Sequence, residues 1–179
     1  MMVIQQNFLY EYWDRAKVSF RLWGIHLKRR WYFYVLPIFA FAVFHYFYMI
    51  SVNVSQSLKG SFFITVRNVL PDKRGDYVSF FWLGDINYAK GVQFTKRVAG
   101  IAGDEVIVVG RNVFVNGNFI GMAKEVSKRG MPLEVIKPGR IPDGYIFVQG
   151  DHKDSLDSRY ALCGLIDMKN VIGKSYLVF

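Results

Sequence analysis

The sequence has few of the residues that build disulfides and metal centres, with one cysteine and three histidines among 179 residues. The single cysteine, Cys163, excludes an internal disulfide and is interpreted as a small core residue. Only His152 lies beyond residue 50, and no second histidine or cysteine stands at a spacing typical of metal ligands. We therefore predict no metal ion and no other cofactor.

Charge is absent from one long segment, residues 31–50, which reads WYFYVLPIFAFAVFHYFYMI. Twenty residues in a helix extend about 30 Å, the thickness of the hydrocarbon core of a bilayer. Aromatic residues at both ends match the interfacial belts of membrane helices. We predict a transmembrane helix over residues 31–50. A buried core helix would be less uniformly apolar, and a cleaved signal peptide would have a shorter apolar core followed by small residues.

Basic residues outnumber acidic residues before this segment. Residues 1–30 hold six Lys or Arg against two acidic residues, and KRR at 28–30 adjoins the apolar segment. The positive-inside tendency then places residues 1–30 in the cytoplasm and residues 51–179 in the periplasm, as in a single-pass protein of a bacterial inner membrane. The formal net charge of +9 is attributed to lipid head groups rather than nucleic acid, since no nucleic-acid-binding motif accompanies it.

Short β-type segments separated by turn residues dominate the chain beyond residue 60, and no helical period is sustained there. Asn116-Gly117, between two of these segments, is typical of a two-residue hairpin turn. Residues 123–140, which mix charge, Gly and Pro, are predicted to form a long loop. We therefore predict a mostly β domain over residues 51–179. The predicted strands lie within residues 61–68, 76–82, 91–101, 105–109, 112–115, 118–122, 145–149 and 175–179.

Two serines, Ser55 and Ser57, follow the apolar segment, and a serine nucleophile there would need a base. Histidine is nearly absent from the outer domain, so the base that suits a serine is a lysine whose pKa is lowered by burial. Lys96 stands in the β-type segment VQFTKRVAGIAGD, where strand alternation places Phe94, Lys96 and Val98 on one face. The alternative is an ordinary lysine at a sheet edge whose ammonium reaches water.

Four segments resemble conserved boxes of the signal peptidase I family and occur in the family's order. They are KRGDYVSFF (73–81), KRVAGIAGDEV (96–106), VFVNGNFI (113–120) and GDHKDSLDSRY (150–160). The resemblance covers residues 53–166, downstream of the predicted membrane helix. It implies a mostly β, signal-peptidase-like catalytic domain attached to a single N-terminal transmembrane helix. It also implies a serine endopeptidase that uses a Ser/Lys dyad.

The resemblance assigns roles to the residues of the predicted site. Ser57 matches the nucleophile and Lys96 the general base, so that the neutral lysine would remove the serine proton. Ser55 matches the residue whose hydroxyl completes the oxyanion hole with the backbone N–H of Ser57. Ser155 matches the serine that orients the lysine. Two further residues are implied to hold this loop in place as an ion pair: Asp157 and Arg159.

The segment after Ser57 departs from the general signal peptidases, in which Met-x-Pro-Thr follows the nucleophile. Here Leu58 and Lys59 follow, and Gly60 and Phe62 resemble the branch encoded with conjugative pilus machinery. The outer domain is also compact, with little room for a large second β domain. We therefore favour a dedicated peptidase that matures a pilin or another transfer protein, with a general signal peptidase I as the alternative.

The implied substrate is a preprotein or prepilin with a signal peptide, and the implied partner surface is the lipid bilayer. Small residues are implied at substrate positions −1 and −3, where shallow apolar pockets would select them. Two other classes share features with this chain. One is a catalytically inactive, structural component of a conjugative secretion apparatus. The other is the group of self-cleaving repressors, which use Ser/Lys chemistry but carry a DNA-binding domain in place of a membrane helix.

Overall fold

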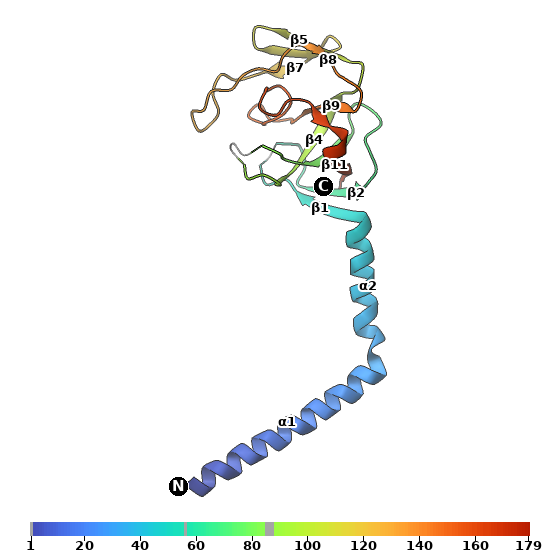
Figure 1. Ribbon diagram of the computed structural model, residues 1–179, viewed down its shortest axis with the longest axis vertical. Helices are drawn as coiled ribbons and strands as arrows, with labels where there is room; N and C mark the ends of the chain where they lie inside the picture. Colours follow the sequence, from blue (N-terminus) through green and yellow to red (C-terminus); the bar gives the residue numbers. More distant parts are fainter. Residues whose placement is uncertain (1, 56, 85–87) are drawn as a thin grey trace. The chain divides into compact units, whose positions relative to one another are not determined.

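The computed structural model describes residues 2–55, 57–84 and 88–179, and of residues 2–12 it describes the backbone alone. The chain forms two units, Met1–His45 and Tyr46–Phe179 (Figure 1). Two helices, α1 (Met2–Arg30) and α2 (Tyr32–Phe47), build the first unit. The second unit is mostly β, as the sequence pattern predicts.

Helix α2 is shorter than the predicted helix over residues 31–50. It ends at Phe47, and strand β1 (Tyr48–Val52) follows at once. β1 pairs antiparallel with β2 (Phe62–Arg67) along its whole length. Tyr, Ile and Val suit a paired strand as well as an apolar helix, so the sequence has no feature that marks this boundary. The prediction of a helix is therefore wrong for residues 48–50.

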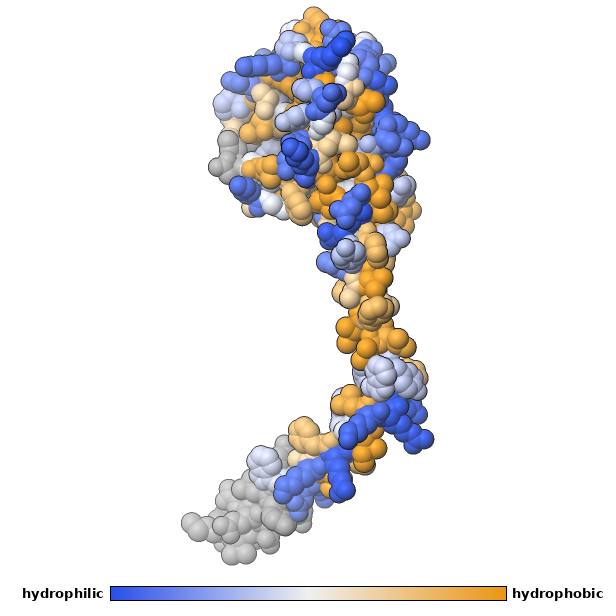
Figure 2. Space-filling view, turned by 45° about the vertical axis from the view of Figure 1, so that its right-hand side comes forward, coloured by the Kyte–Doolittle hydropathy of each residue, from blue (hydrophilic) through white to orange (hydrophobic). Residues whose placement is uncertain are grey.

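The side chains of α2 are exposed in the first unit, and none of its residues is buried. Figure 2 shows hydrophobic residues along the α2 segment. Helix α1 ends in Lys28, Arg29 and Arg30, and basic side chains there interact favourably with the negative end of the helix dipole. Within the described part of the chain, no helix is both long enough and apolar enough to cross a membrane.

Two antiparallel sheets build the second unit. The larger has seven strands in the order β1-β2-β11-β3-β4-β9-β10, and the smaller has four in the order β7-β6-β5-β8. The labels of the smaller sheet gather at one end of this unit in Figure 1, and β1 and β2 lie at the other. The remaining elements are β3 (Tyr77–Phe81), β4 (Gln93–Gly100), β5 (Glu105–Val109), β6 (Asn112–Val115), β7 (Asn118–Met122), β8 (Gly139–Arg140), β9 (Tyr145–Gln149), β10 (Ile166–Asp167), the 3₁₀ helix η1 (Met168–Asn170) and β11 (Val171–Leu177).

Each of the eight predicted strand segments overlaps a strand of the structure. The hairpin turn between β6 and β7 is confirmed, since Asn116 has φ 49° and Gly117 has φ 76°, the positive values that this turn needs. Residues 123–138 form the loop between β7 and β8. Besides β1, strands β8 and β10 were not predicted, because two residues are too few to show an alternating pattern. The predicted loop over residues 123–140 is therefore wrong for Gly139 and Arg140, which form β8.

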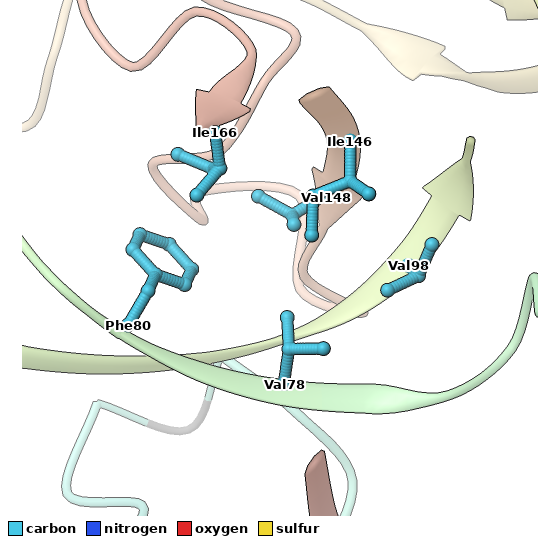
Figure 3. Close-up of a cluster of buried hydrophobic side chains, with 6 residues drawn as sticks. All are labelled: Val78, Phe80, Val98, Ile146, Val148 and Ile166. Carbon is cyan, nitrogen blue, oxygen red and sulfur yellow. The ribbon is translucent and has the colours of Figure 1, made fainter. Parts of the chain in front are cut away.

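The core of the larger sheet lies on one face. Six buried side chains from β3, β4, β9 and β10 point toward one another there (Figure 3). A second buried cluster joins the smaller sheet to Phe147 of β9, so β9 connects the two cores. The first cluster consists of Val78, Phe80, Val98, Ile146, Val148 and Ile166.

The opposite face of the larger sheet is polar where five strands meet. β1, β2, β3, β4 and β11 each contribute one side chain to a hydroxyl cluster, which consists of Ser51, Thr65, Ser79, Thr95 and Ser175. Thr65 Oγ1 lies 2.9 Å from Ser175 Oγ and 3.0 Å from Ser79 Oγ. The side-chain amide of Gln93 in β4 donates to Ser51 in β1. The sheet is therefore curled, because β1 and β4 meet although three strands separate them in the sheet order.

Gly173 in β11 is a position that leaves no room for a side chain. A Cβ there would lie 1.9 Å from the carbonyl oxygen of Val66 in β2. We predict that Gly173→Ala lowers the free energy of unfolding by about 2 kcal/mol, because β11 would have to move away from β2.

Urea denaturation of the full chain measures this effect. Gly24→Ala is the matched control, since nothing lies within 4 Å of a Cβ at Gly24 in α1, and alanine is the better helix former. An unchanged denaturation midpoint for Gly173→Ala would contradict the close approach of β11 and β2.

Candidate active site

The loop between β1 and β2 carries Ser57. Asn53 holds this loop closed, because its amide nitrogen donates to the carbonyl oxygens of Leu58 (2.8 Å) and Gly60 (2.9 Å). Leu58 is buried and anchors the loop, and Ser57 is only 6% exposed. The carbonyl oxygen of Ser57 accepts hydrogen bonds from two successive backbone N–H groups of the loop after β9. Ser57 is therefore fixed through its main chain by two separate parts of the fold.

Lys96 lies in β4, where it is the cross-strand partner of the buried Val78 in β3. Its side chain is therefore on the apolar face that strand alternation predicts. It is 5% exposed, and its Nζ donates to the Ser155 hydroxyl at 2.7 Å. Burial lowers the pKa of Lys96 to about 8, and the negative charge of Asp157 offsets part of that effect. At pH 7, a pKa near 8 leaves about a tenth of the amine neutral, far more than in an ordinary lysine.

Ser155, Asp157 and Arg159 belong to the loop that follows β9. Arg159 donates to both carboxylate oxygens of Asp157, through Nε at 2.8 Å and Nη2 at 2.9 Å, in a buried ion pair. Asp157 also accepts a hydrogen bond from the Gly150 N–H, and Arg159 donates to the carbonyl oxygen of Ser155. This ion pair thus fixes the two ends of the loop that presents the Ser155 hydroxyl to Lys96.

One cavity of about 600 Å³ brings the predicted residues together. Ser55, Ser57, Lys96 and Ser155 all line it, and the ion pair of the β9 loop lies outside its lining. Ser55 is exposed, and its hydroxyl donates to Asn53 Oδ1 at 3.5 Å. Within the described residues, no hydrogen bond joins the Ser57 hydroxyl to Lys96, whose amine donates to Ser155 instead. Nucleophile–base hydrogen bonds are often long or poorly aligned without substrate, so the lack of one among the described residues fits a resting site.

Two residues at the start of the segment 150–160, Gly150 and Asp151, join the loops of the site. A Cβ at Gly150 would lie 2.0 Å from the Ser155 hydroxyl oxygen, so glycine is required for this approach. One carboxylate oxygen of Asp151 accepts the Lys59 N–H at 3.0 Å, and the other lies 3.1 Å from Arg97 Nη2. The sequence indicates the Asp151–Arg97 contact only through the opposite charges of the two residues, which lie in two different family-like segments.

Asp104 performs a similar structural task away from the cavity. It accepts hydrogen bonds from Arg74 Nε (2.7 Å), the Ile101 N–H (2.9 Å) and the Asn116 amide (2.7 Å). The Arg74 guanidinium, together with these other donors, holds the pKa of Asp104 at about 2 against the opposing effect of burial. Asp104 therefore ties together three of the four segments that resemble family boxes.

A buried serine that lines one cavity with a partly neutral amine is suited to acyl transfer, in which the serine oxygen attacks a carbonyl carbon. The one thiol of the chain is not an alternative nucleophile at neutral pH. Burial raises the pKa of Cys163 to about 12, so its reactive thiolate form is scarce.

Comparisons with known proteins agree with this chemistry. The family model described as "Signal peptidase, peptidase S26" matches residues 28–179. A protein named signal peptidase I from Bacillus licheniformis is 38% identical over 123 residues, which are 64% of this chain and 63% of that protein. Signal peptidase I P from Bacillus subtilis subsp. natto is 31% identical over 136 residues, which are 69% of this chain and 72% of that protein.

The chain thus spans less than two thirds of the length of the Bacillus licheniformis relative. Among solved structures, a signal peptidase I from Enterococcus faecalis is 22% identical, with a TM-score of 0.38 over 59% of this chain and 97% of that one.

The buried Lys96 makes stability depend on pH in a defined direction. Its pKa falls from 10.5 to about 8 on folding, so between these values the unfolded chain holds a proton that the folded chain has released. Stability therefore rises with pH through this window, and below pH 8 the burial cost is fully present. We predict that Lys96→Met is more stable than the wild type at pH 7, by about 2 to 3 kcal/mol.

Urea denaturation at pH 7 and pH 10 measures this difference, which is expected to shrink at the higher pH. Lys174→Met is the matched control. Lys174 forms ion pairs with Asp72 (2.7 Å) and Asp76 (2.9 Å), and these hydrogen-bonded carboxylates raise its pKa. Its replacement is expected to destabilise the protein. A Lys96→Met variant that is less stable than the wild type at pH 7 would contradict the predicted cost of burying the Lys96 ammonium.

Proposed function

The chain belongs to the peptidase S26 signal peptidase family. We propose that it is a membrane-anchored serine endopeptidase that removes signal peptides from exported preproteins. One observation carries the proposal. Lys96 is buried, with a pKa of about 8, and it lines the same cavity as Ser57. A serine and a lysine in that condition form a nucleophile and its base without histidine or metal.

In the proposed reaction, neutral Lys96 removes the proton of the Ser57 hydroxyl as Oγ attacks the carbonyl carbon of substrate residue −1. The C–N bond then breaks, and the Lys96 ammonium gives its proton to the leaving amine. Water attacks the resulting ester, with Lys96 again accepting the proton, and Ser57 is regenerated. Ser155 keeps the amine in place through its hydrogen bond at 2.7 Å.

The oxyanion formed in each step needs hydrogen-bond donors that are already in position. We propose the backbone N–H of Ser57 and the hydroxyl of Ser55 for this role. The Ser57 main chain is held by hydrogen bonds from the β9 loop to its carbonyl oxygen. Among the described residues, the Ser55 hydroxyl makes one hydrogen bond, a weak 3.5 Å contact to Asn53 that a substrate oxyanion would replace.

The substrate is proposed to bind as an extended strand along β4. Residues 93–96 of β4 pair with β3 on one side, whereas pairing with β9 on the other side begins only at Arg97. The cavity lies beside this stretch of β4 and beside β1. A peptide strand placed there would use the backbone groups that β9 leaves unpaired.

We propose that residues 31–47 associate with the bilayer and that the chain is a single-pass protein of a bacterial inner membrane. This segment carries no charged residue, and the side chains of α2 within it are exposed, with Ile38 at 68% and Phe41 at 69%. The basic residues of α1 support a cytoplasmic N-terminus and a periplasmic β unit. Tethering of the enzyme and a signal peptide to one membrane raises their effective concentration.

A dedicated role in the maturation of a pilin or another transfer protein is the narrower form of the proposal. The sequence after Ser57 supports it, because Gly60 and Ser61 stand in place of the Pro-Thr of the general signal peptidases and Phe62 follows. The Bacillus relatives are named signal peptidase I, which supports general preprotein processing as the second candidate.

Loss of either member of the dyad is expected to abolish cleavage. We predict that Ser57→Ala and Lys96→Ala each lower kcat/KM by at least about 10⁴-fold, while the wild type shows an ascending pH limb with a midpoint near 8. Ser61→Ala, in the same loop, is the matched control and is expected to retain activity, because Ser61 is exposed and outside the cavity lining.

N-terminal mass analysis of exported proteins in cells with each variant identifies the substrates. Accumulation of one uncleaved precursor in both inactive variants would identify a dedicated peptidase. Accumulation of many preproteins would identify a general one. If every N-terminus stays unchanged, the proposed peptidase activity is wrong, and a structural component remains as the explanation.

Membrane association is tested separately. The wild type is expected to stay in the membrane pellet after alkaline carbonate extraction, and external protease is expected to digest residues 51–179 in spheroplasts. Phe39→Lys combined with Phe41→Lys is expected to release the protein, because two charges in the apolar segment oppose insertion. Phe119→Lys, an exposed position in β7, is the control and is expected to stay in the pellet. Release of the wild type by carbonate would contradict the proposal.

A further inference from the structure

Part of the cavity wall formed by β1 and β4 is polar, although Ile50, Val52 and Phe94 of the same strands also line the cavity and the family resemblance implies shallow apolar pockets. Ser51, Gln93 and Thr95 line this part, together with Asn53. Behind them lie the other members of the hydroxyl cluster, Thr65, Ser79 and Ser175, all buried. A substrate side chain that enters here would meet hydrogen-bonding groups.

The hydrogen bonds of the hydroxyl cluster leave one end of the Gln93 side-chain amide without a partner among the described residues. The Gln93 amide nitrogen donates to Ser51 and, at 3.2 Å, to Ser79. Within the described residues, the Gln93 carbonyl oxygen accepts no hydrogen bond, and Gln93 is only partly buried. A half-turn of the amide would exchange its two ends and leave the nitrogen unused instead. In either orientation, one polar atom of Gln93 is available to a substrate.

Strand geometry identifies the substrate residue that reaches this point. Side chains −1 and −3 of an extended substrate lie on one face, about 7 Å apart, and side chain −2 points away. On β4, Thr95 and Gln93 stand one and three positions before Lys96 and share the face of the hydroxyl cluster. β9 leaves only the stretch of β4 up to Lys96 unpaired, so a substrate with its −1 carbonyl level with Lys96 would run parallel to β4. Its −3 side chain would then lie between Thr95 and Gln93.

We propose that this part of the cavity is a polar subsite that takes a serine or threonine side chain at substrate position −3, an inference that rests on the proposed function. A hydroxyl both donates and accepts, so it satisfies Gln93 in either amide orientation. It is also small enough to meet the size limit implied for this position. A valine there would cover the Gln93 amide without a partner, a loss that disfavours an otherwise similar side chain.

Cleavage of peptides that differ only at position −3 tests the subsite. The full-length enzyme is given substrates with Ser, Thr, Ala, Val or Leu at −3 and a constant Ala at −1. The wild type is expected to cleave the Ser and Thr peptides about tenfold faster than the Val peptide, as kcat/KM. Gln93→Leu is expected to abolish this preference or to reverse it toward Val.

Two controls isolate the effect of Gln93. Gln149→Leu makes the same exchange in the neighbouring β9, outside the cavity lining, where the amide donates to the Ile120 carbonyl oxygen. It is expected to keep the preference for Ser and Thr at −3. The same series of residues placed at −2 is expected to give no preference, since that side chain points away. Each preference is a ratio within one enzyme, so a smaller folded fraction in a variant does not change it.

The outcomes separate the two proposals. Equal cleavage of all −3 peptides by the wild type, or an unchanged preference in Gln93→Leu, overturns the polar subsite and leaves the peptidase function intact. Failure of the wild type to cleave any peptide or full-length preprotein in the series overturns the peptidase function and the subsite with it.

Discussion

The burial of Lys96 is the condition on which the rest of the site depends. An amine removed from water loses hydration, and that loss lowers its pKa toward the range in which it can accept a proton. The negative charge of Asp157 limits this lowering of the pKa, because it favours the ammonium form. Ser155 gives the amine a fixed hydrogen-bond partner. Proton acceptance and stability are therefore opposed at this residue, since the burial that leaves part of the Lys96 amine neutral at pH 7 also destabilises the fold.

The loop after β9 connects the buried Lys96 to the other residues of the site. Within ten residues, it supplies the Ser155 hydroxyl to Lys96, two N–H groups to the Ser57 carbonyl and the Asp151 carboxylate to Lys59 and Arg97. The Asp157–Arg159 ion pair is fully engaged by hydrogen bonds, which is the condition under which a buried pair is tolerated. One loop thus aligns two segments of the chain that share no strand pairing.

Much of this arrangement could be predicted from the sequence where the pattern is local. Alternation along residues 93–98 indicated the buried face of Lys96, and Asn116-Gly117 indicated the hairpin, because each depends on a few adjacent residues. The end of α2 at Phe47 could not be predicted, since it is set by pairing of β1 with a strand further along the chain. The hydroxyl cluster was missed for a different reason. Serine and threonine at alternate strand positions indicate a solvated face, and only the curl of the sheet buries that face here.

The position of strand β11 in the sheet has a consequence for folding during synthesis. It lies between β2 and β3 and provides Ser175 to the hydroxyl cluster, although it is the last strand along the chain. During synthesis, β2 and β3 emerge first and have no partner between them until residues 171–177 follow. Contacts of such long sequence separation form slowly, because the intervening chain must be ordered first. Strands β2 and β3 can therefore join into one sheet only after β11 has been synthesised, and we expect the cavity lined by Ser57 and Lys96 to assemble after that point.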